Sequence, residues 1–89
     1  MPYIPEYDRK KIDPLIDALV RRAEQLSVGE LNYVITKVLI SRFPRVYADY
    51  NQIIGVLECV KLEFYRRYVA EYEQSKLREN GDITTNFGV

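Results

Sequence analysis

The sequence predicts an all-α protein: a helical hairpin followed by one long C-terminal helix, assembled as a homo-oligomeric helical bundle. Apolar residues recur every three or four positions through three stretches, and helix caps and prolines separate those stretches. The length of the last stretch predicts the assembly. We expect a single domain over residues 1–89, with an extended N-terminal arm at 1–12 and an extended tail at 82–89.

Asp13 and Pro14 predict the start of the first helix, because aspartate caps helix N-termini and proline suits the first helical position. Pro5 can open one additional turn through residues 6–8. The helix that follows is expected to be amphipathic and about 12 residues long. Its apolar positions are Leu15, Ile16, Leu19, Val20, Ala23 and Leu26.

Ser27 and Glu30 have the spacing of a capping box, which predicts the start of the second helix. Pro44 ends this helix. Only two or three residues join it to the first helix, so the two are expected to pack as an antiparallel hairpin. Its apolar face consists of Leu31, Val34, Ile35, Val38, Leu39 and Phe43.

The long helix is predicted from Asp49 as its cap to Glu79, with a stop at Asn80 and Gly81. About 30 residues at about 1.5 Å each span roughly 45 Å, whereas a compact domain of this size is only about 30 Å across. The helix therefore either kinks near Gly55 or, as we prefer, packs its far end on another copy in a dimer or tetramer. One face carries Tyr50, Ile53, Leu57, Val60, Phe64, Tyr68 and Tyr72.

The sequence contains one cysteine, Cys59, and no histidine. A single thiol cannot form an internal disulfide, and a zinc site would lack both of its usual ligand types. We expect Cys59 to be buried and inert. Ser27 is already explained as a cap, and no glycine-rich phosphate loop occurs. We therefore expect a protein that is not an enzyme, with no catalytic residues, no metal and no cofactor.

Thirteen basic and thirteen acidic residues cancel, which argues against a nucleic-acid-coating protein. No apolar run is long enough to cross a membrane. The N-terminus lacks the basic and apolar regions of a signal peptide. These features predict a cytoplasmic protein, located in the host cytoplasm if a phage encodes it.

The best candidate binding site is the cluster Tyr65, Arg66, Arg67 and Tyr68 on the long helix. Arginine forms bidentate contacts with phosphate, and tyrosine stacks on bases. In an oligomer this cluster is expected to meet partner residues around a small anionic ligand; the candidates are Tyr7, Arg9, Lys10 and Tyr33. The alternative is a solvated, ion-paired face, since Glu63 and Glu71 are within reach of Arg67. A second candidate anion site is the N-terminus of the second helix, where Glu30 competes as a capping carboxylate.

Several segments resemble a family of short uncharacterised proteins from tailed phages and prokaryotes, to which no activity is assigned. The longest are GELNYVIT at 29–36 and IGVLECVKLEFYRR at 54–67. Shorter ones are MPYIP at 1–5, KIDPLI at 11–16, YADYN at 47–51 and ENGD at 79–82. The resemblance covers nearly the whole chain and implies a phage setting.

Three functions remain open at this point. The first is a counter-defence sponge that sequesters a nucleotide immune signal, such as a cyclic dinucleotide, between subunits; its basis is analogy with small oligomeric phage proteins. The second is a protein-interaction module, an inhibitor or assembly factor, that docks on a host or phage protein. The third is a DNA-binding accessory protein that uses the first two helices, against which the neutral charge argues.

Overall fold

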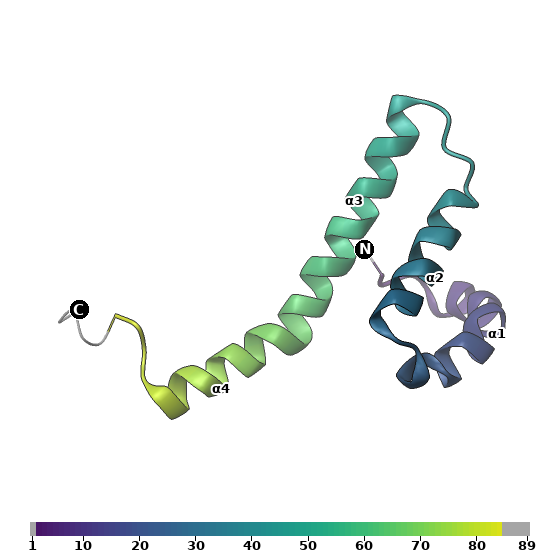
Figure 1. Cartoon of the computed structure of the whole chain (residues 1–89). Helices are drawn as coiled ribbons and strands as arrows, with labels where there is room; N and C mark the ends of the chain where they lie inside the picture. The colour runs from purple at the N-terminus through teal and green to yellow at the C-terminus, as the bar shows by residue number, and fades with distance from the viewer. Residues whose placement is uncertain (1, 85–89) are drawn as a thin grey trace. The chain divides into compact units, whose positions relative to one another are not determined.

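The structure is a computed structural model that describes residues 2–84, and all regular elements within that range are helical. The all-α prediction is confirmed. The chain divides into two compact units, Met1–Ile54 and Gly55–Val89, each of which is described by itself. In chain order the elements are α1 (Glu6–Arg21), η1 (Ala23–Gln25), α2 (Val28–Ile40), α3 (Tyr47–Phe64), η2 (Tyr65–Val69) and α4 (Ala70–Asn80) (Figure 1).

The first helix begins earlier than predicted. The backbone N–H groups of Asp8 and Arg9 donate to the Pro5 carbonyl at 3.0 and 3.1 Å, so α1 starts at Glu6 and only residues 2–5 of the described part of the predicted arm precede it. Pro14, expected at the first helical position, lies inside the helix. A proline there removes one backbone hydrogen bond. The continuous helix shows that the upstream start, with Glu6 and Asp8 in its first turn, prevails over that local break.

The predicted capping box at the start of α2 is confirmed. The Glu30 N–H donates to Ser27 Oγ at 3.1 Å, and the Ser27 N–H donates to Glu30 Oε1 at 2.8 Å. The helix ends at Ile40, a few residues before the predicted end. Although η1 makes the connection from α1 short, α1 and α2 bury no residue against each other. The two helices of the expected antiparallel hairpin are therefore loosely packed, with every residue of each helix at least partly exposed.

The long helical stretch of the sequence begins at Tyr47, not at Asp49. Asp49 stabilises this start from within the first turn, because its Oδ2 accepts the N–H groups of Arg45 and Val46 at 3.0 and 3.3 Å. The helix passes through Gly55 without a break, so the kink considered there is not present.

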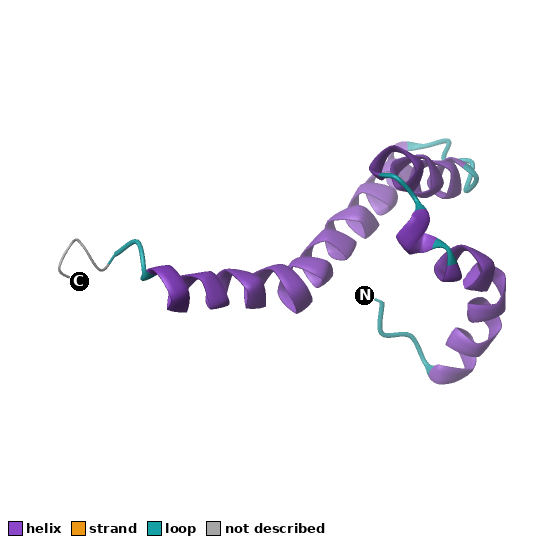
Figure 2. Cartoon of the chain, turned by 60° about the horizontal axis from the view of Figure 1, so that its bottom comes forward, coloured by secondary structure: helices purple, strands orange, loops and turns teal. Residues whose placement is uncertain are grey.

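The helix changes direction instead at η2, where α3 passes into α4 (Figure 2). The predicted stop is confirmed: α4 ends at Asn80, and Gly81 takes a φ of 89° that favours glycine. In the predicted extended tail, the Thr84 N–H donates to Asp82 Oδ1 at 3.0 Å, which forms a turn. The rest of that tail, 85–89, lies outside the described residues.

Within residues 2–84 no side chain is buried. The apolar rows identified in the sequence exist as helix faces, but the chain itself covers none of them completely. Cys59, which we expected to be buried, is exposed. None of the helices in the described range is long and apolar enough to span a membrane.

The two capping carboxylates predict how stability depends on pH. The backbone N–H and then the hydroxyl of Ser27 lower the pKa of Glu30 below 4.5. The N–H groups of Arg45 and then Val46 lower the pKa of Asp49 below 3.8, with a further contribution from the charge of Arg42. A carboxyl with a lowered folded-state pKa stabilises the fold fully above its unfolded-state pKa, and this contribution is lost as the pH falls through the folded-state value.

We therefore expect the free energy of unfolding to be level near neutral pH and to fall in acid. Urea denaturation followed by circular dichroism between about pH 7 and about pH 3, at fixed protein concentration, measures this slope. The double variant Glu30→Gln, Asp49→Asn should flatten it. The control is Glu24→Gln, Glu71→Gln, since neither carboxylate forms a hydrogen bond or ion pair among the described residues. An unchanged acid slope in the first variant would contradict the assignment.

Candidate functional site

The predicted binding cluster coincides with a π-helical segment. η2 covers Tyr65–Val69, and the Ala70 N–H donates to the Tyr65 carbonyl five residues earlier. A π-helical turn is rare and is often found at functional sites, since it interrupts the regular α-helical hydrogen-bond ladder. The residue chemistry of the sequence predicted a binding cluster at Tyr65–Tyr68. The unusual backbone geometry is a second, independent feature of the same residues.

The two arginines of this segment differ in their surroundings. Consecutive helical residues point about 100° apart, so Arg66 and Arg67 project from different sides. Arg66 Nη2 lies 2.6 Å from Glu63 Oε1, and the Glu63 side chain is only 19% exposed. Arg67 forms no ion pair or hydrogen bond with any described residue. The ion pair that we considered between Glu63 and Arg67 is formed by Arg66 instead, and Glu71 forms no ion pair among the described residues. The Arg67 guanidinium therefore remains available.

An aromatic row runs along the helix next to these arginines. The rings of Phe64 and Tyr68 lie 5.2 Å apart at an interplanar angle of 38°, a favourable tilted arrangement. One turn further on, Lys76 Nζ lies 5.6 Å from the centre of the Tyr72 ring. Sequence reasoning assigned Phe64 and Tyr72 to an apolar face and did not include Lys76. The four-residue spacing of 64, 68, 72 and 76 is the signal that joins them.

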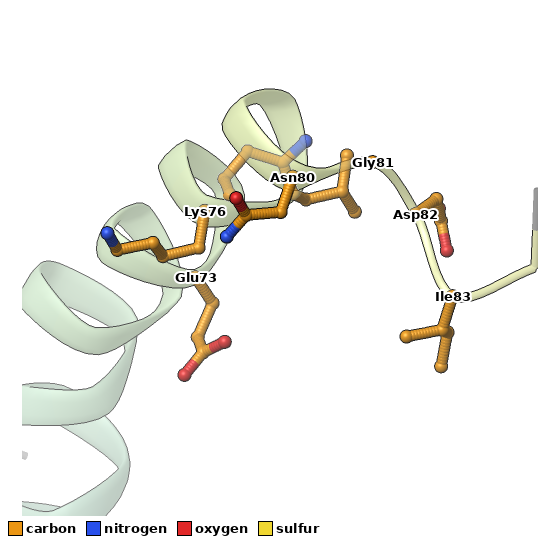
Figure 3. A pocket seen from close by; sticks show the side chains of 8 residues that line it. Glu73, Lys76, Asn80, Gly81, Asp82 and Ile83 are labelled. Carbon is orange, nitrogen blue, oxygen red and sulfur yellow. The ribbon is translucent and has the colours of Figure 1, made fainter.

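A pocket of about 410 Å³ lies at the end of α4, beside Lys76 (Figure 3). Its polar lining is mixed, with Glu73, Asp82, Asn80 and Lys76. The Lys76 ammonium is already engaged, because Glu79 Oε2 lies 3.4 Å away. This pocket therefore provides no free positive charge for an anion, and Arg67 remains the better anchor.

The other predicted site residues lie in the first unit and are largely engaged locally. On α1, Arg9 Nη1 donates to the Ile4 carbonyl at 2.7 Å, and Lys10 Nζ lies 3.4 Å from Glu6 Oε1. The Tyr7 ring lies beneath Lys11 Nζ at 5.6 Å. Tyr33 is on α2 and is exposed.

These residues do not form one site within a unit. Tyr7, Arg9 and Lys10 share α1, Tyr33 lies on α2, and Tyr65–Tyr68 belong to the second unit. At the N-terminus of α2, Glu30 already accepts the Ser27 N–H and satisfies the start of the helix, so an anion would have to displace it. In the part of the chain described, no group of three His, Cys, Asp or Glu residues is placed to hold a metal ion.

The chain belongs to the family described as Domain of unknown function (DUF6899), whose sequence profile matches residues 1–83. No curated protein and no solved structure matches the chain. The prediction that the chain belongs to an uncharacterised family is confirmed. The family description names no site residues, so the candidate site rests on the geometry of the chain itself.

Substitution of the two arginines is expected to leave the fold intact. Arg66 is 65% exposed in its pair with the half-buried Glu63, so we expect the loss of that pair to cost about 1 kcal/mol, and Arg67 has no ion pair to lose among the described residues. Alanine also favours a helix slightly more than arginine does. We expect Arg66→Ala, Arg67→Ala to shift the free energy of unfolding by about 1 kcal/mol or less in urea titrations. A loss well beyond that would show that the segment is structural and not available for binding.

Proposed function

We propose that this protein is a non-enzymatic, homo-oligomeric binding protein. Copies of the chain cover one another's apolar helix faces, and the seams between them present arginine and tyrosine side chains to a small anionic ligand. The observation that carries the proposal is the absence of any buried side chain from residues 2–84, although large apolar side chains occur on every α-helix of that range.

Size supports association of this kind. Chains of fewer than about 40 residues rarely fold alone without a disulfide, a metal or a partner, and the second unit is shorter than that. The single cysteine excludes an internal disulfide. Equal numbers of acidic and basic residues mean that no net charge opposes the approach of identical copies.

The ligand is proposed from the chemistry of the π-helical segment. Arg67 offers a planar guanidinium that is unpaired within residues 2–84, and such a group binds phosphate through two parallel hydrogen bonds. Tyr65 and Tyr68 are each at least half exposed and offer ring faces on which a base can stack. Phosphate and base together describe a nucleotide. In a phage setting, which the sequence resemblance suggests, the specific function is a sponge that sequesters a nucleotide immune signal such as a cyclic dinucleotide.

The assembly is tested by sedimentation velocity at micromolar concentration. We expect a particle of two or four times the 10.5 kDa chain mass, since exposed apolar surface favours association. The result should persist at high salt, because the proposed contacts are apolar and salt screens only the charged ones. A single 10.5 kDa particle would overturn the proposal.

The ligand is tested by thermal denaturation against a panel of cyclic mononucleotides and dinucleotides. A ligand at 100 times its dissociation constant stabilises the folded state by about 2.7 kcal/mol, which raises the melting temperature of a small domain by about 10 °C. Arg67→Ala should abolish this increase. Arg78→Ala is the matched control, because Arg78 is an exposed α4 arginine with no ion pair among the described residues. If no compound on the panel raises the melting temperature, the nucleotide assignment fails while the assembly stands.

A protein-interaction module is the second candidate, and the exposed apolar faces favour it as well. It differs from the first proposal in what covers those faces. A chain that sediments as a monomer and forms a complex of fixed stoichiometry with one host or phage protein would favour the module over the homo-oligomer.

A further inference from the structure

We infer that an apolar pocket between the end of α2 and the start of α3 receives the Phe43 ring of a second copy, in a two-fold symmetric contact. This inference rests on the proposed homo-oligomer and identifies the surface through which it forms. Every residue that carries the argument lies in the first unit.

The pocket has a volume of about 200 Å³ and is lined by Leu39, Ile40, Pro44, Tyr50, Ile53 and Ile54. Its lining is almost entirely apolar. A closed apolar cavity of about 150 Å³ is large enough to bind benzene. This pocket has a similar volume but is open to solvent, so an aromatic ring would lie against its lining and not be enclosed by it. Among the described residues, no side chain fills it. An apolar side chain that enters it would remove both surfaces from water.

Phe43 lies in the chain between the lining residues Ile40 and Pro44. Its N–H donates to the carbonyl of the lining residue Ile40 at 2.9 Å, and its neighbour Pro44 is also a lining residue. Among the described residues, Phe43 alone has a positive φ without being glycine, at 54°. The residue is 71% exposed. A positive φ is unfavourable for a bulky residue, and this exposure leaves much of an aromatic side chain in water.

An exposed ring on the residue next to the lining residue Pro44 is suited to a two-fold contact. In such an interface residue i of one copy contacts residue j of the other, and j contacts i in return. Each Phe43 then enters the partner's pocket while its own pocket receives the partner's ring. The contact closes on itself, so it gives a dimer and leaves no unpaired pocket to extend a chain of copies.

The exposed apolar side chains near the pocket supply much of the area that a stable dimer needs. A standard interface buries about 800 Å² on each partner. Phe43, Tyr47 and Tyr50 are each more than half exposed, and aromatic side chains bury about 150–250 Å² apiece, so these three supply roughly 300 Å². Ile40, Val46 and Ile54 are also more than half exposed and add to that area.

The first experiment measures self-association of Phe43→Gly by sedimentation. Glycine accepts the positive φ, so this variant removes the ring without straining the backbone. We expect the dissociation constant of the dimer to rise at least 10-fold. Val28→Gly is the control for loss of an exposed apolar side chain on the same unit, since Val28 is 86% exposed and does not line the pocket. Equal dissociation constants for Phe43→Gly and the unaltered protein would overturn the inference.

The second experiment locates the partner surface directly. Phe43 is replaced by the photo-reactive p-benzoylphenylalanine, and ¹⁵N-labelled chains carrying it are mixed with unlabelled, unaltered chains. We expect mixed-isotope cross-links to the peptide that contains residues 50–54. Cross-links only within one chain, or to α4 of the other copy, would overturn the inference. An oligomer that keeps its mass while both experiments fail refutes this contact alone, whereas a monomeric unaltered protein refutes the proposed function as well.

Discussion

The need to cover apolar surface governs the rest of this structure. Burial of apolar area is the main favourable contribution to folding, at about 25 cal/mol per Å². In residues 2–84 that contribution is incomplete, because every side chain keeps contact with solvent. What holds the helices in the isolated chain is mostly local: backbone ladders, the Ser27–Glu30 box, the Asp49 carboxylate and short-range ion pairs such as Glu58–Lys61 at 2.9 Å. Helical stability in proteins normally comes from packing of an amphipathic face, so such local terms leave the fold dependent on a partner.

The features that the sequence predicted correctly are those that depend on local chemistry. A capping box needs only a serine and a glutamate three residues apart, and Gly81 ends a helix because glycine accepts a positive φ. The failures occur where two local signals compete. Asp13 and Pro14 are a good helix start, yet Pro5 provides another start eight residues upstream of Asp13, and the longer helix prevails. Asp49 was assigned as the cap because aspartate favours that position, but its side chain reaches back to two N–H groups that precede the helix.

The candidate site was predicted in its residues but not in its geometry. Tyr65, Arg66, Arg67 and Tyr68 stood out by chemistry, whereas the π-helical turn that carries them depends on a five-residue hydrogen bond for which no sequence rule exists. The sequence also could not predict which arginine pairs with Glu63, because Arg66 and Arg67 lie three and four residues from it and both spacings allow an ion pair. The structure shows that Glu63 binds Arg66. Tyr7, Arg9, Lys10 and Tyr33 were chosen as residues of a partner chain, and a single chain leaves that choice a prediction.

Assembly and ligand binding are thermodynamically linked if the ligand lies at a seam. A ligand that contacts two copies binds the oligomer better than the separated chain, so it strengthens association by the same factor by which association strengthens its binding. The size of this linkage depends on where the two surfaces lie. The Phe43 contact belongs to the first unit and the Arg67 segment to the second, so dimer formation and ligand binding can be measured as separate events. A nucleotide that leaves dimer formation unchanged would then be bound within one copy, and one that drives dimers into tetramers would join the second units. The order of assembly with and without ligand thus distinguishes a storage protein with independent sites from a cooperative sponge.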